Sequence, residues 1–174
     1  MNVNKSLDNN TILIAVIDGT KARFLTLELT QLPDDNSGPN LIEHKVLYNL
    51  NNELSGQELW ANTKTGRNRG AANQAHSYDD HRQNHIMEFE RRFAQTISHQ
   101  IISFIQLYQA RHLILAAEPQ ILGFMREALM PKIPKNIKLN ELAKDLCQLK
   151  PKELHEYLAN KKLLPARKNV SQIE

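Results

Sequence analysis

The stretch TILIAVIDGTKARFLTLEL, residues 11–29, decides how the fold begins. Residues 11–17 are apolar and rich in β-branched side chains, and they end at Asp18-Gly19, a strong turn pair. Residues 21–29 then resume with alternating apolar side chains. The stretch predicts a β-hairpin, in which Asp18 serves as a turn residue.

A third strand is expected at residues 41–48, after the turn-forming segment QLPDDNSGPN at 31–40. Three early strands joined by turns indicate an antiparallel meander. The continuous apolar run HLILAA, residues 112–117, is typical of a strand buried on both faces. Residues 137–139 are interpreted as a short edge strand.

Helices are expected between and after these strands. The longest is predicted from Ser77, as N-cap, to about residue 110, because its apolar residues recur at steps of three or four: Ile86, Phe89, Phe93, Ile97, Ile101, Phe104 and Tyr108. Residues 119–130 and 151–159 each read as a helix with proline at its start. The order of elements predicts an α/β fold, with a mixed central sheet covered by helices.

Length and composition bound the rest. With 174 residues, of which 41% are hydrophobic, the chain can form one domain, expected over residues 11–160 with flexible tails at 1–10 and 167–174. No apolar run reaches the length of a membrane span, and the start lacks the features of a secretory signal, so we expect a cytoplasmic protein without a membrane partner. The single cysteine, Cys147, is expected to be an ordinary reduced thiol.

A polar segment at residues 62–76 separates the third strand from the long helix and is too long for a simple connection. Its basic residues suit a polyanion, because each phosphate that is neutralised releases counterions. A solvated surface is the alternative interpretation. Two basic groups stand out, Lys64, Arg67, Arg69 and Arg82 in and beside this segment, and Lys161, Lys162, Arg167 and Lys168 in the tail.

Five stretches in order, including VIDGTKARF at 16–24, GRNRGAANQAH at 66–76 and LILAAEPQILGFMREAL at 113–129, resemble the bacterial host attachment protein family over about residues 11–160. The other two are FERRFAQTIS at 89–98 and ELAKDLCQLKPKELHEYL at 141–158. That family is in turn similar to the middle domain of class 1 release factors of archaea and eukaryotes and of Pelota. The resemblance implies the same mixed-sheet α/β fold.

In release factors, the loop before the long helix carries Gly-Gly-Gln and promotes hydrolysis of the peptidyl-tRNA ester on the ribosome. The resemblance implies that residues 66–74 are the counterpart, with Gln74 as the candidate catalytic residue. This sequence has Gly70-Ala71-Ala72-Asn73-Gln74, without a Gly-Gly pair, and alanine accepts a positive φ only at a cost. Gln74 at the start of the helix with no special role is therefore the alternative.

Metal and cofactor chemistry find little support in the sequence. His76, Asp79, Asp80, His81 and His85 lie within ten residues, but the pattern lacks the glutamate of an HExxH motif, and helix capping explains the aspartates. Asp145 is explained by capping or a salt bridge. We therefore expect no metal and no cofactor.

Three functions stay open. The leading hypothesis is a release-factor-like protein that contacts ribosomal RNA or tRNA through residues 64–74, the second a peptidyl-tRNA hydrolase that uses Gln74, and the third a non-catalytic protein-interaction or attachment-related module. Enzymatic activity is thus left undecided, and the ribosome or tRNA is the expected partner. The expected RNA contacts are Lys64, Arg67, Arg69, Gly70, Asn73 and Arg82.

Overall fold

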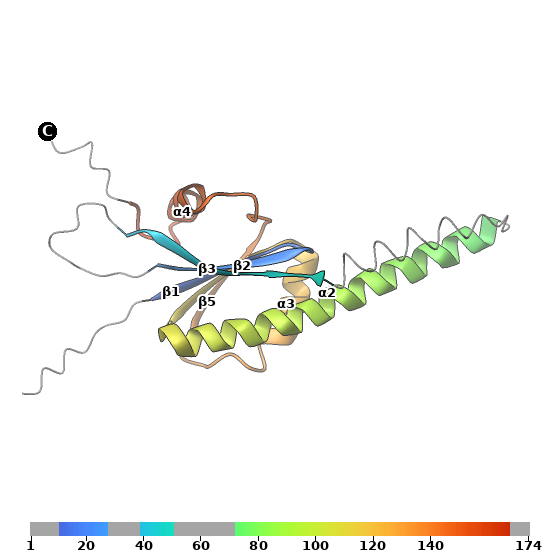
Figure 1. Ribbon diagram of the computed structural model, residues 1–174, viewed down its shortest axis with the longest axis horizontal. Helices are drawn as coiled ribbons and strands as arrows, with labels where there is room; N and C mark the ends of the chain where they lie inside the picture. Colours follow the sequence, from blue (N-terminus) through green and yellow to red (C-terminus); the bar gives the residue numbers. More distant parts are fainter. Residues whose placement is uncertain (1–10, 28–38, 51–71, 168–174) are drawn as a thin grey trace, which may run out of the picture.

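A five-stranded mixed sheet forms the centre of the protein (Figure 1). The structure, a computed structural model, describes residues 11–27, 39–50 and 72–167, and of residues 72–80 it describes the backbone only. The strands are β1 (Ile12–Ile17), β2 (Lys21–Leu27), β3 (Leu41–Tyr48), β4 (His112–Ala117) and β5 (Lys138–Ala143), in the order β3-β2-β1-β4-β5.

Strand directions confirm the predicted mixed sheet. β1 pairs with β2, and β2 with β3, in antiparallel register, which is the expected meander. β4 lies parallel to β1, with Leu13 opposite Leu113, and β5 lies parallel to β4. A bulge between Phe24 and Leu25 shifts the pairing of β2 with β3. The carboxyl ends of β1, β4 and β5 therefore meet at one edge of the sheet.

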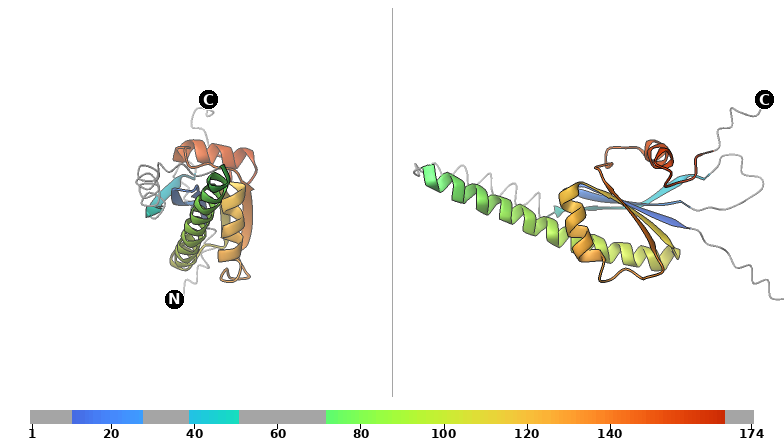
Figure 2. Two further views of the ribbon diagram at one scale, coloured as in Figure 1. Left: turned by 90° about the vertical axis from the view of Figure 1, so that its right-hand side faces the viewer. Right: turned by 180° about the vertical axis from the view of Figure 1, so that it is seen from behind.

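Helices cover both faces of the sheet, as expected. α2 (Ala72–Tyr108) and α3 (Pro119–Leu129) lie on one face, and α4 (Pro151–Asn160) lies on the other (Figure 2). Each face has its own core, because successive side chains of β1 point to opposite sides. Leu13, Ala15 and Ile17 pack with α2 and α3, whereas Ile14 and Val16 pack with α4.

The long helix begins earlier than the sequence predicted. α2 starts at Ala72, so Ser77 lies inside the helix and the prediction that it is the N-cap is wrong. Alanine has the highest helix propensity, and the segment AANQAH contains neither glycine nor proline to stop the helix. The capping signal at Ser77 was therefore overridden by propensity. The helix ends at Tyr108, two residues before the predicted end.

The remaining elements agree with the predictions to within a few residues. β4 has the predicted bounds, and α3 and α4 both start with proline and end within one residue of the predicted position. β5 is an edge strand, as predicted, but it is six residues long and reaches Ala143. The predicted end of the hairpin at residues 28–29 lies outside the described residues.

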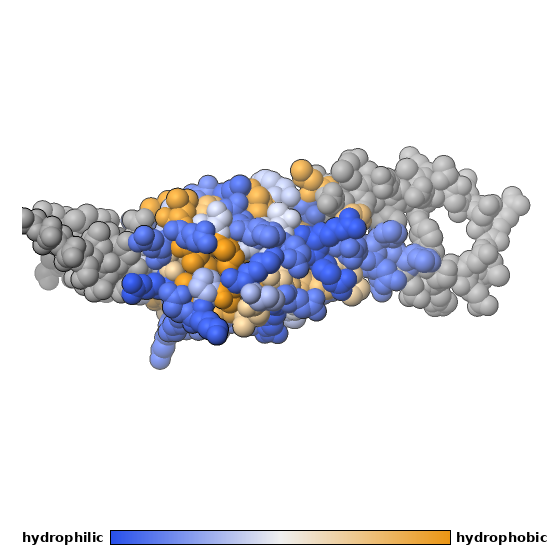
Figure 3. Space-filling model, turned by 90° about the horizontal axis from the view of Figure 1, so that it is seen from below, coloured by the Kyte–Doolittle hydropathy of each residue, from blue (hydrophilic) through white to orange (hydrophobic). Residues whose placement is uncertain are grey.

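The molecular surface is largely hydrophilic on the side of α2 and α3, with hydrophobic residues visible between the polar ones (Figure 3). Among the described residues, the large apolar side chains that are exposed on the helices are Met87 and Leu107 of α2 and Met130 after α3. None of the described helices combines the length and the apolar character that a membrane span requires.

Candidate functional site

The predicted RNA-contact residues divide between two regions. Lys64, Arg67, Arg69 and Gly70 lie outside the described residues. Asn73 and Gln74 lie in the first turn of α2, although their side chains are not described. Arg82 is exposed on α2, further along the helix, and it forms no ion pair within the described part of the chain.

The amino-terminal part of α2 projects from the body of the protein (Figures 1 and 2). Among the side chains of the helix that the structure describes, from residue 81 onward, the first buried one is Phe93, and residues 81 to 85 are all exposed. Glu90 marks the place where the helix meets α3, because Gln120 donates a hydrogen bond to it over 3.2 Å. From Glu90 to Ala72 the helix rises about 27 Å, at 1.5 Å per residue. We call residues 72–89 the α2 arm.

The two arm histidines whose side chains the structure describes belong to no group of three potential metal ligands. His81 and His85 are both exposed, and the ring of His85 stacks near Phe89 with 6.4 Å between centroids. The side chains of His76, Asp79 and Asp80 lie outside the described set. Within the described residues, the group that could offer three ligand atoms lies elsewhere, at the carboxyl edge of the sheet.

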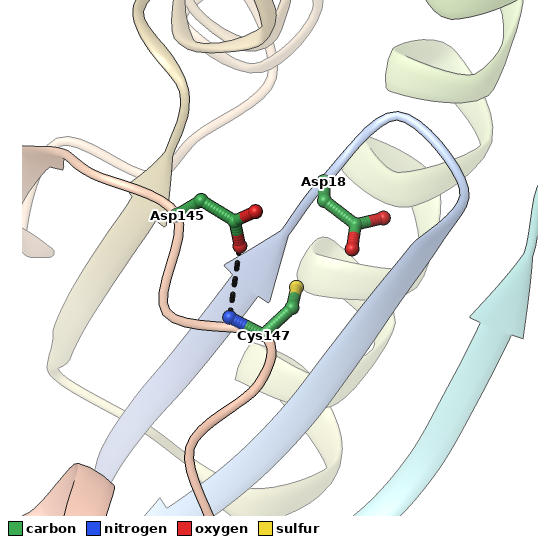
Figure 4. A group of neighbouring side chains, drawn as sticks. All are labelled: Asp18, Asp145 and Cys147. Atoms are coloured by element: carbon green, nitrogen blue, oxygen red, sulfur yellow. Dashed lines mark hydrogen bonds between the residues drawn. The ribbon is translucent and has the colours of Figure 1, made fainter.

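This second group consists of Asp18, Asp145 and Cys147, whose ligand atoms lie within 4.8 Å of one another (Figure 4). Asp18 follows β1, and the other two residues follow β5, so the parallel strands bring them together. Asp18 Oδ1 accepts hydrogen bonds from the Thr20 amide at 2.7 Å, the Thr20 hydroxyl at 2.8 Å and the Lys21 amide at 2.8 Å. Asp18 is thus the turn residue that the sequence predicted.

Asp145 and Cys147 complete the group. Asp145 Oδ1 accepts a hydrogen bond from the Cys147 amide at 2.9 Å, so of the two predicted explanations, capping or a salt bridge, the structure shows a local cap of a turn. Cys147 is a free thiol, only 3% exposed, and its Sγ lies beside the carboxylate of Asp18. The structure thus agrees with the predicted ordinary thiol.

The electrostatics of the group explain its protonation states. Burial raises the pKa of the Cys147 thiol strongly, and the charges of Asp18 and Asp145 raise it further. Burial also acts to raise the pKa of Asp18, but hydrogen bonds from Thr20, Lys21 and Cys147 outweigh it and lower that pKa overall. A protonated thiol is a poor nucleophile and a poor metal ligand. Since backbone amides already use one oxygen of each carboxylate, we assign the group a structural role.

Arg23 fixes the segment that carries Cys147, and sequence reasoning missed it. The residue is 7% exposed, although most of the buried residues of its strand are apolar. Its Nε and Nη2 donate to the Glu43 carboxylate at 2.7 and 3.2 Å, while Nη1 donates to the carbonyl oxygens of Cys147 at 3.0 Å and Leu149 at 2.6 Å. The bond to Glu43 raises the pKa of Arg23, so the guanidinium stays charged. The sequence did contain one indication of this burial. Alternate residues of a strand point to the same face of the sheet, so Arg23 points to the same face as the buried Leu25 and Leu27.

Two further carboxylates lie at this edge of the sheet. Glu118 follows β4, and its charge reaches Glu90 of α2. Burial, and then the charge of Glu118, raise the pKa of Glu90. Sequence reasoning did not single out either residue, although polar residues that directly follow parallel strands meet at one edge of the sheet.

Comparisons with known proteins agree with the family suggested by the sequence. The family model described as "Protein required for attachment to host cells" matches residues 13–158. No curated protein matches the chain. Among solved structures, the crystal structure of the archaeal translation termination factor aRF1 is similar, with a TM-score of 0.43 and 13% sequence identity, over 91% of this chain and 36% of that one. The family match covers most of the chain, and the chain therefore belongs to the host attachment protein family.

Proposed function

We propose that the protein binds RNA of the translation machinery, ribosomal RNA or tRNA, through the tip of the α2 arm and the basic segment that precedes it. The observation that carries this proposal is the arm itself. Arg69 precedes Ala72, the first residue of the helix, by three positions, and the helix then projects roughly 27 Å beyond its contact with α3. A projecting element can enter a groove that the body of the protein cannot, and Lys64, Arg67 and Arg69 come just before it in the sequence.

Electrostatics favour a phosphate ligand at this end of the helix. The first backbone N–H groups of an α-helix have no partner within the helix, and the helix dipole places partial positive charge there. Lys64, Arg67 and Arg69 add full charges just before Ala72, and Arg82 is exposed further along the arm. Contacts of this kind fix position on an RNA backbone and do not read its sequence.

Hydrolysis of peptidyl-tRNA is not part of the proposal. Gln74 lies in the first turn of a regular helix, and the backbone at Ala72 is also helical. A loop that approaches an ester through positive-φ residues cannot be formed at these positions without unwinding the helix. Binding needs charge, which Lys64, Arg67 and Arg69 supply, and reach, which the arm supplies without such unwinding.

Sedimentation of cell lysate through sucrose gradients, at low and at physiological salt, tests the proposal. The wild-type protein should migrate with ribosomal subunits or tRNA complexes at low salt, and crosslinking should recover RNA. The variant Arg67→Gln/Arg69→Gln should shift toward the top of the gradient. If the wild-type protein stays entirely at the top under all salt conditions, the proposal fails.

The matched control is Arg91→Gln/Arg92→Gln, which removes the same charge from α2 at a point where the helix lies on the body. Both arginines pair with Glu88, at 3.4 and 3.0 Å, and their side chains are 49% and 64% exposed; Arg91 also lies 5.2 Å from the centre of the Phe124 ring, a contact that contributes little at an exposed site, so the fold should stay intact. We expect this control to sediment like the wild-type protein. Equal loss of RNA by both variants would show that net charge, and not the arm, drives association.

A further inference from the structure

The carboxyl-terminal segment around α4 concentrates positive charge on the face opposite to α2. Residues 144–167 hold six of the 22 lysines and arginines and three of the 19 aspartates and glutamates of the chain. The formal charge of this segment, +3, therefore equals that of the whole chain, and the remaining residues sum to zero. The basic residues are Lys144, Lys150, Lys152, Lys161, Lys162 and Arg167.

These six residues have no acidic partner among the described residues, unlike four of the arginines elsewhere in the chain. Arg23, Arg91, Arg92 and Arg126 each form an ion pair with a glutamate. Within the described residues, none of the six has a carboxylate within ion-pair distance. Two of the three acidic side chains of the segment instead accept hydrogen bonds from backbone amides, Asp145 from Cys147 and Glu153 from Lys150. The positive charge is thus not neutralised locally.

Two of the lysines converge on one aromatic ring. Lys144 follows β5, and its Nζ lies 5.1 Å from the centre of the Tyr157 ring. Lys161 is the C-cap of α4, and its Nζ lies 5.8 Å from the same centre. Each contact is an ordinary cation–π interaction, but together they hold two like charges near one point. An anion that both ammonium groups can share reduces the repulsion between them.

The chain after α4 adds further charge at this place. Lys162 directly follows Lys161, and the segment beyond it is tied back to α4 by a hydrogen bond between His155 Nε2 and the Pro165 carbonyl oxygen at 2.8 Å. Arg167 lies two residues past this tie, and its Nε is buried without a hydrogen-bond partner. Because that nitrogen is enclosed by protein atoms, Arg167 contributes positive charge to this place and not a donor that a ligand oxygen can reach.

We propose that Lys144 and Lys161, which lie over the Tyr157 ring, together with Lys162 and Arg167, which follow α4 in the chain, bind the phosphates of single-stranded RNA; these four residues are called the α4 basic face. The class of ligand rests on the proposed function, whereas the surface lies across the sheet from α2 and is distinct from the arm. Lysine ammonium groups bind phosphates as point charges, and Tyr157 positions two of them before the ligand arrives. The protein then contacts RNA from two sides of its sheet.

Fluorescence anisotropy with labelled oligouridine and the full-length protein, at several salt concentrations, tests this surface. The variant Lys144→Gln/Lys161→Gln should lower the slope of log K against log salt by about 1.4, at about 0.7 per phosphate contact with a single strand. That slope change corresponds to roughly tenfold weaker binding at physiological salt. The matched control is Lys135→Gln/Lys138→Gln, which removes two exposed lysines elsewhere and should leave the slope unchanged.

A second variant separates positioning from charge. Tyr157→Leu keeps all lysines, so the salt slope should stay the same while the affinity falls, because the ammonium groups lose their common support. Tyr157→Phe keeps the ring face and should bind like the wild-type protein. If Tyr157→Leu also binds like the wild-type protein, the ring does not position the lysines and that part of the inference is wrong.

The outcomes distinguish the two proposals. RNA binding that is weakened by Lys144→Gln/Lys161→Gln but not by Arg67→Gln/Arg69→Gln supports the α4 basic face and excludes the arm as an RNA contact. The reverse pattern overturns the α4 basic face and leaves the proposed function standing. An equal effect of Lys135→Gln/Lys138→Gln, or binding only to anionic vesicles and not to oligouridine, also overturns it.

Discussion

Replacing Arg23 by methionine should destabilise the protein by about 3 kcal/mol, because removing one partner of a buried ion pair typically costs 3–5 kcal/mol. Methionine resembles the aliphatic part of arginine and leaves no large cavity, so the loss comes from the polar groups. Glu43 loses its cation, and the carbonyl oxygens of Cys147 and Leu149 lose a charged donor. The low end of the range applies because the Glu43 side chain is 29% exposed and can regain water.

Urea unfolding followed by far-UV circular dichroism measures this loss through the midpoint at constant m. Glu43→Gln should cost only about 1 kcal/mol, the size of an ordinary hydrogen-bond change, because Arg23 keeps both carbonyl partners. The double variant Arg23→Met/Glu43→Met should lose less than the sum of the single changes, since no carboxylate is then left unpaired.

Arg126→Met is the matched control. Arg126 also pairs with a glutamate, Glu141, at 2.6 Å, but its side chain is 56% exposed, so we expect no measurable shift of the midpoint. A loss below about 1 kcal/mol for Arg23→Met, well under the range for a broken buried pair, would refute the view that Arg23 holds the Cys147 segment.

Three further predictions concern protonation and backbone strain. Cys147 should react with iodoacetamide at pH 8 at least tenfold more slowly in the native protein than in urea, because its raised pKa and burial keep the thiol protonated and covered. Glu90→Gln should raise the melting temperature at pH 7 but not at pH 4. The pKa of Glu90 is raised above its ordinary 4.5. The contribution of Glu90 to stability is therefore present at low pH and is lost as the pH rises through the raised pKa. Lys162→Gly should stabilise the protein by about 0.5–1 kcal/mol in urea unfolding, because Lys162 has φ 61° at the residue after the α4 C-cap, where glycine carries no steric penalty. Reaction of native Cys147 at the unfolded rate, equal stabilisation by Glu90→Gln at both pH values, or destabilisation by Lys162→Gly would each contradict its prediction.

Much of the fold was predictable because its signals are local. The buried strands β1 and β4 appear as continuous apolar runs, and α3 and α4 carry proline at their starts. The edge strand β5 was underestimated because KLNELA contains Asn140 and Glu141, which an edge strand tolerates and a core strand does not. The start of α2 was missed because a good capping residue at 77 competed with a helix-favouring segment before it.

The candidate sites were less predictable because their partners are distant in sequence. The hydrogen-bond acceptors of Arg23 lie 20 residues away at Glu43 and more than 120 residues away in the Cys147 segment, and no local sequence pattern indicates them. The sequence shows that Lys144 and Lys161 are basic, but only the packing of α4 brings both side chains to Tyr157. Charge can be counted from a sequence, whereas the convergence of charges depends on the tertiary structure.

The two proposed RNA contacts rest on parts of the protein whose local stability must differ. The α4 basic face is anchored by Leu154 and Leu158 in the core, so it opens only with the fold. The α2 arm has no core residue before Phe93 among its described side chains, and an isolated helix of that length is marginal in water. It persists because the packed part of α2 serves as its nucleus, and each further residue needs only propagation. The variant Gln83→Gly should therefore weaken the arm and its RNA contact while leaving the melting temperature of the protein unchanged. A substitution of Leu154 could not have this effect, because Leu154 belongs to the core and its loss would lower the melting temperature.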